Sequence, residues 1–258
     1  MRKNILFILI AFLCVLTMGL VSCKKEKKTE WIAERNFTTG GFAYVRIIHA
    51  APNFTTQTNA RDSFNISFAG AKVNAGSITY TTVFPTASYL ALPSGEQTIR
   101  FFTAGTDDTT VYTFTKNLQQ GQYYSFVITD SLKNSRDESQ MWIADNFSKP
   151  DTSSFSIRFI NAVTSDTAGR SVDLYSVKQQ KNLFSNVQRG SFTNFTANQV
   201  LAGNDTLILR RSGTLNELAR LNAIALSRQR VYTVIYRGLT TLATGSTKRR
   251  ELILYNNL

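Results

Sequence analysis

The chain has 258 residues and carries 29 lysines and arginines against 17 aspartates and glutamates, which gives a formal net charge of +12 at pH 7. With one histidine, His49, and two cysteines, Cys14 and Cys23, it excludes a histidine-based metal cluster, and a disulfide framework is not expected. The sequence shows no phosphate-binding glycine loop, no Gly-x-Ser-x-Gly motif and no nucleic-acid-binding motif, which disfavours those classes of protein.

Residues 1–22 have the anatomy of an export signal. Arg2 and Lys3 give a positive start, and the run from Ile5 to Val21 is apolar and uncharged. This run is shorter than the roughly 20 apolar residues that span a bilayer. An uncleaved signal anchor and an ordinary secretory signal are the alternatives to a lipoprotein signal.

The end of that segment favours the lipoprotein alternative. Leu20-Val21-Ser22-Cys23 resembles a lipobox, which implies cleavage before Cys23, attachment of a diacylglyceryl group to its thiol, and acylation of the new amino group with a chain such as palmitate. More than one acyl chain gives stable membrane anchoring. Cys14 leaves with the signal, so the mature protein has one thiol, and lipid occupies it.

Residues 23–41 are expected to form the lipidated cysteine and a flexible tether, because Lys24–Gly41 is polar and charged. Lys24 follows the cysteine, where an Asp would signal inner-membrane retention in many Gram-negative lipoproteins. The predicted localisation is therefore the cell envelope, anchored in the outer membrane, with the leaflet left open.

The remaining chain is predicted to be all-β, in two tandem domains. It is rich in β-branched and aromatic residues and is interrupted by Gly, Asn, Asp and Ser clusters. A polar break with one proline at residues 148–154 predicts a linker. Residues 42–147 and 155–258 then form the two domains.

An internal repeat supports this division. Ala43–Ala50 aligns with Phe155–Ala162, with Arg46 and Arg158 in the same alternation phase at an offset of 112 residues. Two further pairs of segments align at an offset of 108 residues: Leu92–Ile99 with Val200–Leu207, and Gly121–Ile128 with Gln229–Tyr236. A constant register over this distance indicates two copies of one unit.

The repeat also decides one ambiguous segment. Thr214–Leu226 has the leucine spacing of an amphipathic helix. Its counterpart, Thr106–Leu118, contains the strand-like run Val111–Thr115. We therefore expect a strand in both copies.

Four segments resemble a known family. They are Val45–Asn53, Phe64–Phe68, Tyr89–Gly95 and Gly121–Ser125. Together they are similar to domain of unknown function 4397 (DUF4397), whose pattern includes a first strand ending in His-Ala-x-Pro and a Pro-x-Gly turn. The second copy departs from it, since Asn161 replaces the histidine, although Val172–Tyr175 fits the second strand well. The resemblance implies small immunoglobulin- or prealbumin-like β-sandwiches on exported proteins, with no established activity to transfer.

Few residues suggest chemistry. A catalytic triad would have to use His49, but its place at a strand end favours a structural ring that hydrogen-bonds a neighbouring loop. The acidic pairs Asp107–Asp108 and Asp137–Glu138 could bind calcium, although solvated hairpin tips explain them better. No enzyme activity, metal or cofactor is predicted.

Charge is distributed unevenly between the halves. Residues 42–147 have 7 basic and 8 acidic residues, whereas residues 155–258 have 14 and 5. The candidate anion-binding residues of the second half are Arg210, Arg211, Arg228, Arg230, Lys248, Arg249 and Arg250. If they gather at one end of the domain, they form a site for a polyanion. An evenly solvated basic surface is the alternative.

Three functions follow from these observations. We favour a non-enzymatic, lipid-anchored binding or adhesion module whose partner is an anionic glycan or an envelope protein. An architectural subunit or spacer of an outer-membrane complex is the alternative, and a hydrolase is third. No nucleic-acid partner is expected.

Overall fold

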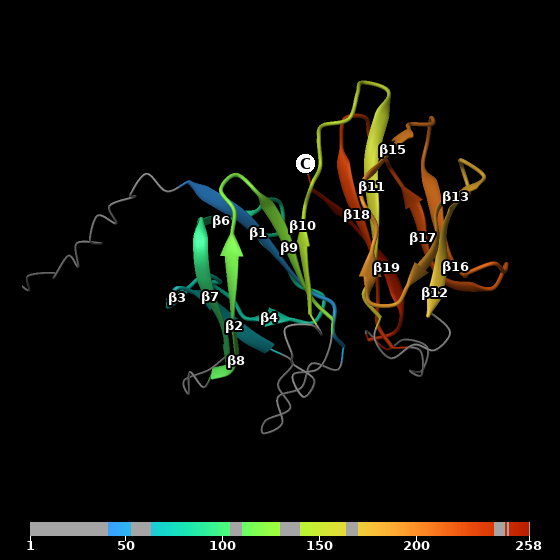
Figure 1. The fold of residues 1–258 in the computed structure, drawn as a ribbon. Helices are drawn as coiled ribbons and strands as arrows, with labels where there is room; N and C mark the ends of the chain where they lie inside the picture. The colour runs from blue at the N-terminus through green and yellow to red at the C-terminus, as the bar shows by residue number, and fades with distance from the viewer. Residues whose placement is uncertain are drawn as a thin grey trace, which may run out of the picture. The chain divides into compact units, whose positions relative to one another are not determined.

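The computed structural model describes residues 41–52, 63–103, 110–129, 140–163, 170–239, 246 and 248–257. Their regular elements are strands β1 to β19, and these residues include no helix (Figure 1). The all-β prediction is confirmed. Within this part of the chain, no helix is long and apolar enough to cross a membrane. The predicted signal, Cys23 and the tether up to residue 40 lie outside the described residues.

Two sheets form the first sandwich. One has the order β10-β9-β1-β5, with β6 also pairing with β1, and the other has the order β3-β2-β7-β8, with β4 also pairing with β2. The strands are β1 (Phe42–His49), β2 (Ser63–Phe68), β3 (Ala71–Lys72), β4 (Ile78–Thr79), β5 (Val83–Phe84), β6 (Leu90–Pro93), β7 (Gly95–Thr103), β8 (Thr110–Leu118), β9 (Tyr123–Ile128) and β10 (Met141–Ala144).

The second sandwich repeats this plan. Its sheets have the orders β14-β11-β18-β19, with β15 also pairing with β11, and β13-β12-β16-β17. The strands are β11 (Ser154–Asn161), β12 (Ser171–Ser176), β13 (Lys181–Gln188), β14 (Ser191–Phe192), β15 (Thr196–Gln199), β16 (Asp205–Arg211), β17 (Glu217–Ile224), β18 (Val231–Arg237) and β19 (Glu251–Asn256).

The strand registers confirm the sequence repeat. β1 runs parallel to β9 with Arg46 opposite Ser125, and β11 runs parallel to β18 with Arg158 opposite Thr233. β17 is a strand that pairs with β16, as the repeat predicted against the helical spacing of its leucines.

Strand periodicity gives each central strand two buried faces. Side chains alternate between the faces of a sheet, so Val45 on β1 and Ile157 on β11 each point into the core of their own sandwich. Ile48 and Ile160 lie in the opposite phase, yet both are at most 1% exposed. The outer faces of these two sheets are therefore covered as well.

A third apolar cluster provides that cover. It combines residues of both sandwiches: Ile48, Ala50, Val127, Met141, Ile143, Ile160, Ala162 and Ile235, with Val83 and Tyr255 packed against it. The two tandem sandwiches thus share a buried interface while their sheets stay separate. Gly40–Leu258 forms one compact unit. That residues 42–147 fold independently stays a prediction.

Candidate functional site

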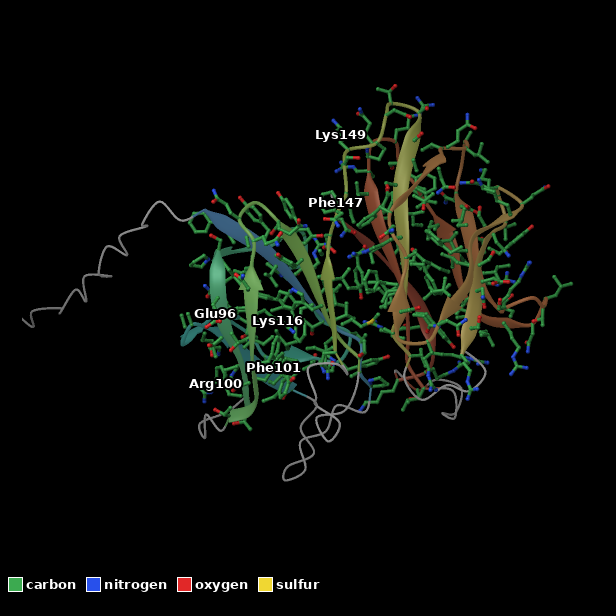
Figure 2. All side chains as sticks on the ribbon, viewed as in Figure 1. Glu96, Arg100, Phe101, Lys116, Phe147 and Lys149 are labelled. Atoms are coloured by element: carbon green, nitrogen blue, oxygen red, sulfur yellow. The ribbon has the colours of Figure 1, made fainter. Side chains whose placement is uncertain are left out.

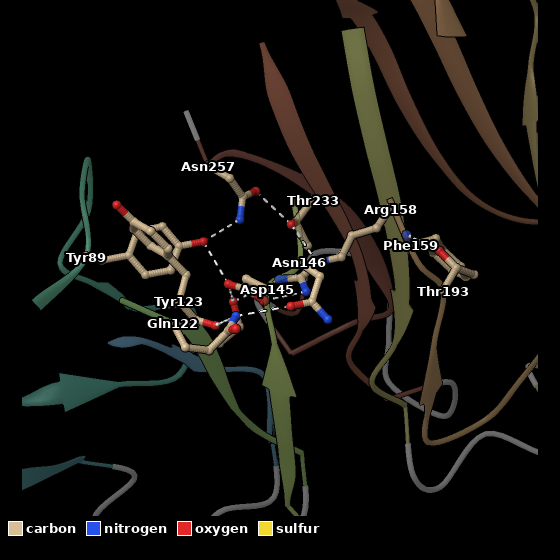
Figure 3. Close-up of polar contacts among 11 residues, drawn as sticks. Tyr89, Gln122, Tyr123, Asp145, Asn146, Arg158, Phe159, Thr193, Thr233 and Asn257 are labelled. Carbon is tan, nitrogen blue, oxygen red and sulfur yellow. Dashed lines mark hydrogen bonds and ion pairs between the residues drawn. The ribbon is translucent and has the colours of Figure 1, made fainter. Parts of the chain in front are cut away.

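A buried arginine joins the two sandwiches. Arg158, on β11, is 1% exposed. Its Nη1 donates to Asp145 Oδ1 at 2.5 Å, its Nη2 donates to Ser125 Oγ at 2.8 Å, and its Nε donates to Thr233 Oγ1 at 2.9 Å (Figure 3). The guanidinium also lies over the ring of Phe195, 4.6 Å from its centroid. Because Asp145 and Ser125 belong to the first sandwich, this side chain crosses the interface.

The equivalent arginine crosses in the other direction. Arg46, on β1, donates through Nη1 to the carbonyl oxygen of Asn256 at 2.9 Å. Its Nε and Nη2 donate to the carbonyl oxygen of Ser88, and its guanidinium lies 4.4 Å from the ring centroid of Tyr89. Burial lowers the pKa of Arg46 from its ordinary value, although nearby Tyr89 and Asp145 oppose that shift. The repeated arginines therefore play reciprocal roles.

A tyrosine hydroxyl completes the network. Tyr89 donates to Asp145 Oδ2 at 2.7 Å and accepts from Asn257 Nδ2 at 2.7 Å, while Thr233 donates to Asn257 Oδ1 (Figure 3). Burial, together with the charge of Asp145, raises the pKa of Tyr89 above its ordinary value. The hydroxyl thus stays protonated as a donor. Every group in this chain of bonds has a structural partner, which suits a joint between domains better than a reaction centre.

Aromatic rings continue the joint beyond the polar network. Phe147 lies in the segment between β10 and β11 (Figure 2). Its ring contacts those of Tyr123 and Phe195, with centroids 5.3 and 5.6 Å away. Tyr123 also stacks on Tyr44 at 4.6 Å. The aromatic contacts therefore reach the residue that directly precedes the predicted linker.

At the apolar end of the interface, two tyrosines lie near Arg237. The guanidinium of Arg237 bonds to Glu251 at 2.7 Å and lies over the ring of Tyr80, 5.2 Å from its centroid. Burial raises the pKa of Tyr80 and of Tyr255 to about 12. These groups stay neutral at physiological pH and add no charge to the interface.

The sequence analysis used the two arginines only to align the repeat and missed this joint. The signal was present, because each arginine stands in the outward phase of its strand and is followed there by an isoleucine and an alanine. An arginine in that setting needs a partner when a second sheet covers the strand.

The predicted anion-binding residues divide between two ends of the second sandwich. Five lie where β16 ends and β19 begins: Arg210, Arg211, Lys248, Arg249 and Arg250. Arg228 and Arg230 precede β18, beside the start of β11, which is the opposite end. The seven residues therefore do not form one patch. Arg210 is further engaged with the ring of Tyr175, 3.9 Å away.

Two arginines that the sequence analysis did not select join the larger group. The backbone N–H of Arg189, after β13, donates to the carbonyl oxygen of Arg170, before β12, at 2.7 Å. Arg211 pairs with Val172 on the neighbouring strand. Arg170, Arg189 and Arg211 are exposed at the same end of three adjacent strands, and we call them the arginine triad. Their separation in sequence hides their proximity.

A shallow groove of about 440 Å³ borders this end. It lies between the edge strands β17 and β19, with Arg220, Arg249 and Arg250 among its lining residues beside Glu217 and Glu251. Arg220 pairs with Glu217 at 2.7 Å. The groove is thus mixed in charge, while the triad beside it is basic.

His49 has a structural setting. It is fully buried at the end of β1, and its ring packs near Phe64 and Tyr80 with centroids 5.2 and 6.1 Å away. Its backbone N–H donates to the carbonyl oxygen of Thr82, and its carbonyl oxygen accepts from the N–H of Thr81. That the ring itself hydrogen-bonds the loop stays a prediction. The acidic pairs at residues 107–108 and 137–138 lie outside the described residues.

The fold and the joint define a β-sandwich protein of two interlocked copies. The family model for domain of unknown function DUF4397 matches residues 43–175, and the chain belongs to this family. The match covers the first sandwich and extends through β11 and most of β12.

Other comparisons add little. No curated protein matches the chain. A crystal structure of a candidate cell adhesion protein from Bacteroides fragilis is similar at 9% identity over 83% of this chain and 98% of that chain, with a TM-score of 0.19. A similarity this low assigns neither a fold nor a function to this chain.

Proposed function

We propose that this protein is a non-enzymatic, lipid-anchored module of the cell envelope that binds an anionic partner through the basic end of its second sandwich. The observation that carries the proposal is the arginine triad, three exposed cations at the ends of adjacent strands, with Arg249 exposed at the same end. Clustered cations concentrate anionic ligands, and a charge that is merely spread over a surface does so less.

The use of the buried polar groups supports a binding role over a catalytic one. Asp145, Ser125 and Arg158 bond to one another across the interface, and the ring of His49 is enclosed by aromatic side chains. These groups hold the fold together. Binding of an anion at an exposed charged surface does not use these buried groups.

Binding is tested with residues Gly40–Leu258, which form a compact unit of their own. Immobilised lipopolysaccharide and heparin serve as anionic probes at rising salt. The triple variant Arg170→Gln, Arg189→Gln, Arg211→Gln should lose retention. Binding should also weaken with salt, since exposed charges are screened over about 8 Å at physiological ionic strength.

A matched control removes the same charge from the opposite end. Lys181→Gln, Arg228→Gln, Arg230→Gln also lowers the net charge by three, at exposed positions near the start of β13 and β18. It should keep most of the retention. Equal losses in the two variants would mean that net charge alone acts, and no retention of the wild type at low salt would end the proposal.

Anchoring is the second part of the proposal. It rests on the lipobox-like sequence ending at Cys23, and Lys24 in place of an Asp after the cysteine favours the outer membrane. Cys23→Ser removes the thiol that forms the thioether. The variant should accumulate unprocessed and lack the mass of the acyl chains. Normal cleavage and normal partition into detergent would refute lipidation.

An architectural spacer is the second candidate. The interlocked sandwiches favour it, because Arg46 and Arg158 fix the two copies against each other through buried bonds. A spacer predicts stable co-purification with envelope proteins that survives neutralisation of the triad.

A further inference from the structure

The turn between β16 and β17 exposes an apolar side chain at the basic end. Leu215 is 84% exposed, the highest value among the exposed large hydrophobic residues in the described part of the chain. Single exposed leucines are common on protein surfaces and need no explanation. This one stands four residues after Arg211 of the triad, which is what gives it interest.

The turn that carries Leu215 is held firmly in place. Gly213 adopts φ +70°, a conformation that favours glycine. Its N–H donates to Asp173 Oδ2 at 3.0 Å, and the hydroxyl of Ser212 donates to Asp173 Oδ1 at 2.9 Å. The N–H of Arg211 closes the hairpin on the carbonyl of Asn216. Leu215 is therefore displayed on a fixed support.

The carboxylate below the turn offsets at most one of the three positive charges of the triad. Asp173 is 6% exposed and accepts bonds from Asn186, Ser212 and Gly213. Arg170, Arg189 and Arg211 remain exposed around it. Phe192, 44% exposed, follows Arg189 by three residues and adds a second apolar side chain nearby.

We propose that the anionic partner is a lipid surface, in which Leu215 enters the apolar layer while the arginine triad contacts headgroup phosphates. This inference rests on the proposed function and names the source of the anion. A bilayer offers negative charge directly above an apolar interior, and basic side chains beside an apolar one match that order. A soluble polysaccharide offers the charge without the apolar layer, so Leu215 would have no apolar environment to enter.

The test measures co-sedimentation of residues Gly40–Leu258 with two kinds of vesicle. Vesicles of phosphatidylcholine and phosphatidylglycerol should bind the wild type, and vesicles of phosphatidylcholine alone should not. Leu215→Ser should weaken binding about tenfold or more, the range expected for removing a leucine from an apolar environment. The triad variant should abolish binding.

Leu201→Ser is the matched control, because Leu201 is 39% exposed at the opposite end of the sandwich. It should bind anionic vesicles as the wild type does. Thermal unfolding of each variant checks that the exposed substitutions leave the fold intact.

The outcomes separate the two levels of the proposal. Loss of binding in the triad variant with full binding by Leu215→Ser overturns the lipid insertion and leaves the anion-binding function standing. Triad-dependent binding to heparin without binding to anionic vesicles has the same meaning. If the triad variant binds every probe as strongly as the wild type, both the lipid insertion and the anion-binding function are overturned.

Discussion

Arg158 of the second sandwich and Asp145 of the first form an ion pair whose side chains are 1% and 0% exposed. Burying two charges is costly unless their remaining hydrogen-bonding groups are also satisfied. Here Ser125 and Thr233 bond to the guanidinium, and Ser125 and Tyr89 donate to the carboxylate. The pair therefore fixes the relative position of the two copies more than it adds net stability.

The first prediction breaks this pair. Arg158→Met leaves Asp145 buried without its cation and should lower the free energy of unfolding by about 3–5 kcal/mol. The double variant Arg158→Met, Asp145→Leu should recover much of that loss. Urea unfolding of the wild type, both single variants and the double variant measures the coupling. Additive losses would show that the two side chains do not act as a pair.

The second prediction removes one hydroxyl. Tyr89→Phe takes a donor from Asp145 and an acceptor from Asn257, and it should cost about 1–3 kcal/mol of unfolding free energy. The control is Tyr44→Phe, whose half-buried ring stacks on Tyr123. Urea unfolding that shows equal stability of Tyr89→Phe and the control would contradict the network.

The third prediction concerns the separated halves. Residues 42–147 alone would expose the apolar face of Ile48, Val127 and Ile143, and a second copy could cover it. In such a pair each Arg46 would meet the Asp145 of its mate. We expect a folded dimer, measured by size-exclusion chromatography with light scattering.

Residues 155–258 should behave differently. They carry Arg158 but have Asn257 at the position equivalent to Asp145, as the matching N–H bonds of Asp145 to Tyr123 and of Asn257 to Val231 show. A pair of second halves would bury two arginines with no carboxylate. We therefore expect this half to be a monomer that is less stable than the isolated first half. A stable dimer would refute the assignment of Asp145 as the essential partner of the buried arginine.

The fourth prediction is a pH dependence at the β16–β17 turn. Burial alone would raise the pKa of Asp173, but bonds from the backbone of Asn186 and Gly213 and from Ser212 outweigh it and lower the pKa. A carboxyl whose pKa is lowered by folding stabilises the protein above its unfolded value, about 3.9, and loses that contribution as pH falls through the folded value.

Asp173→Asn should therefore flatten the acid side of the stability profile while leaving the turn less stable at neutral pH. Thermal unfolding from neutral to acid pH measures both effects. If the variant loses stability at acid pH as steeply as the wild type, other carboxyl groups cause that loss.

Side-chain alternation and the alignment of the internal repeat were enough to predict much of the fold. The shared phase of Arg46 and Arg158 located equivalent central strands, and the offset of 108 residues identified β17 as a strand despite its helical leucine spacing. Both inferences use only side-chain alternation and internal comparison. Neither depends on which strands pair.

The site depended on pairing that the sequence does not show. Arg170 and Arg189 meet Arg211 only because β13, β12 and β16 are neighbours in one sheet. Arg228 and Arg211 are closer in sequence, yet they lie at opposite ends of the sandwich. Pairing between distant strands is set by the whole core, so a count of charges along the chain cannot group them.

The pairing of β1 has a mechanical consequence. β1 begins at Phe42, pairs with β6 and β5 on one side and runs parallel to β9 on the other. A pull on the chain before Phe42 acts along the axis of β1, so the hydrogen bonds to both neighbours share the force in shear instead of opening one after another. Forced unfolding is governed by the unfolding rate. A strand held on two sides in this way should yield slowly, which suits the proposed tether at one terminus and binding at a distant surface.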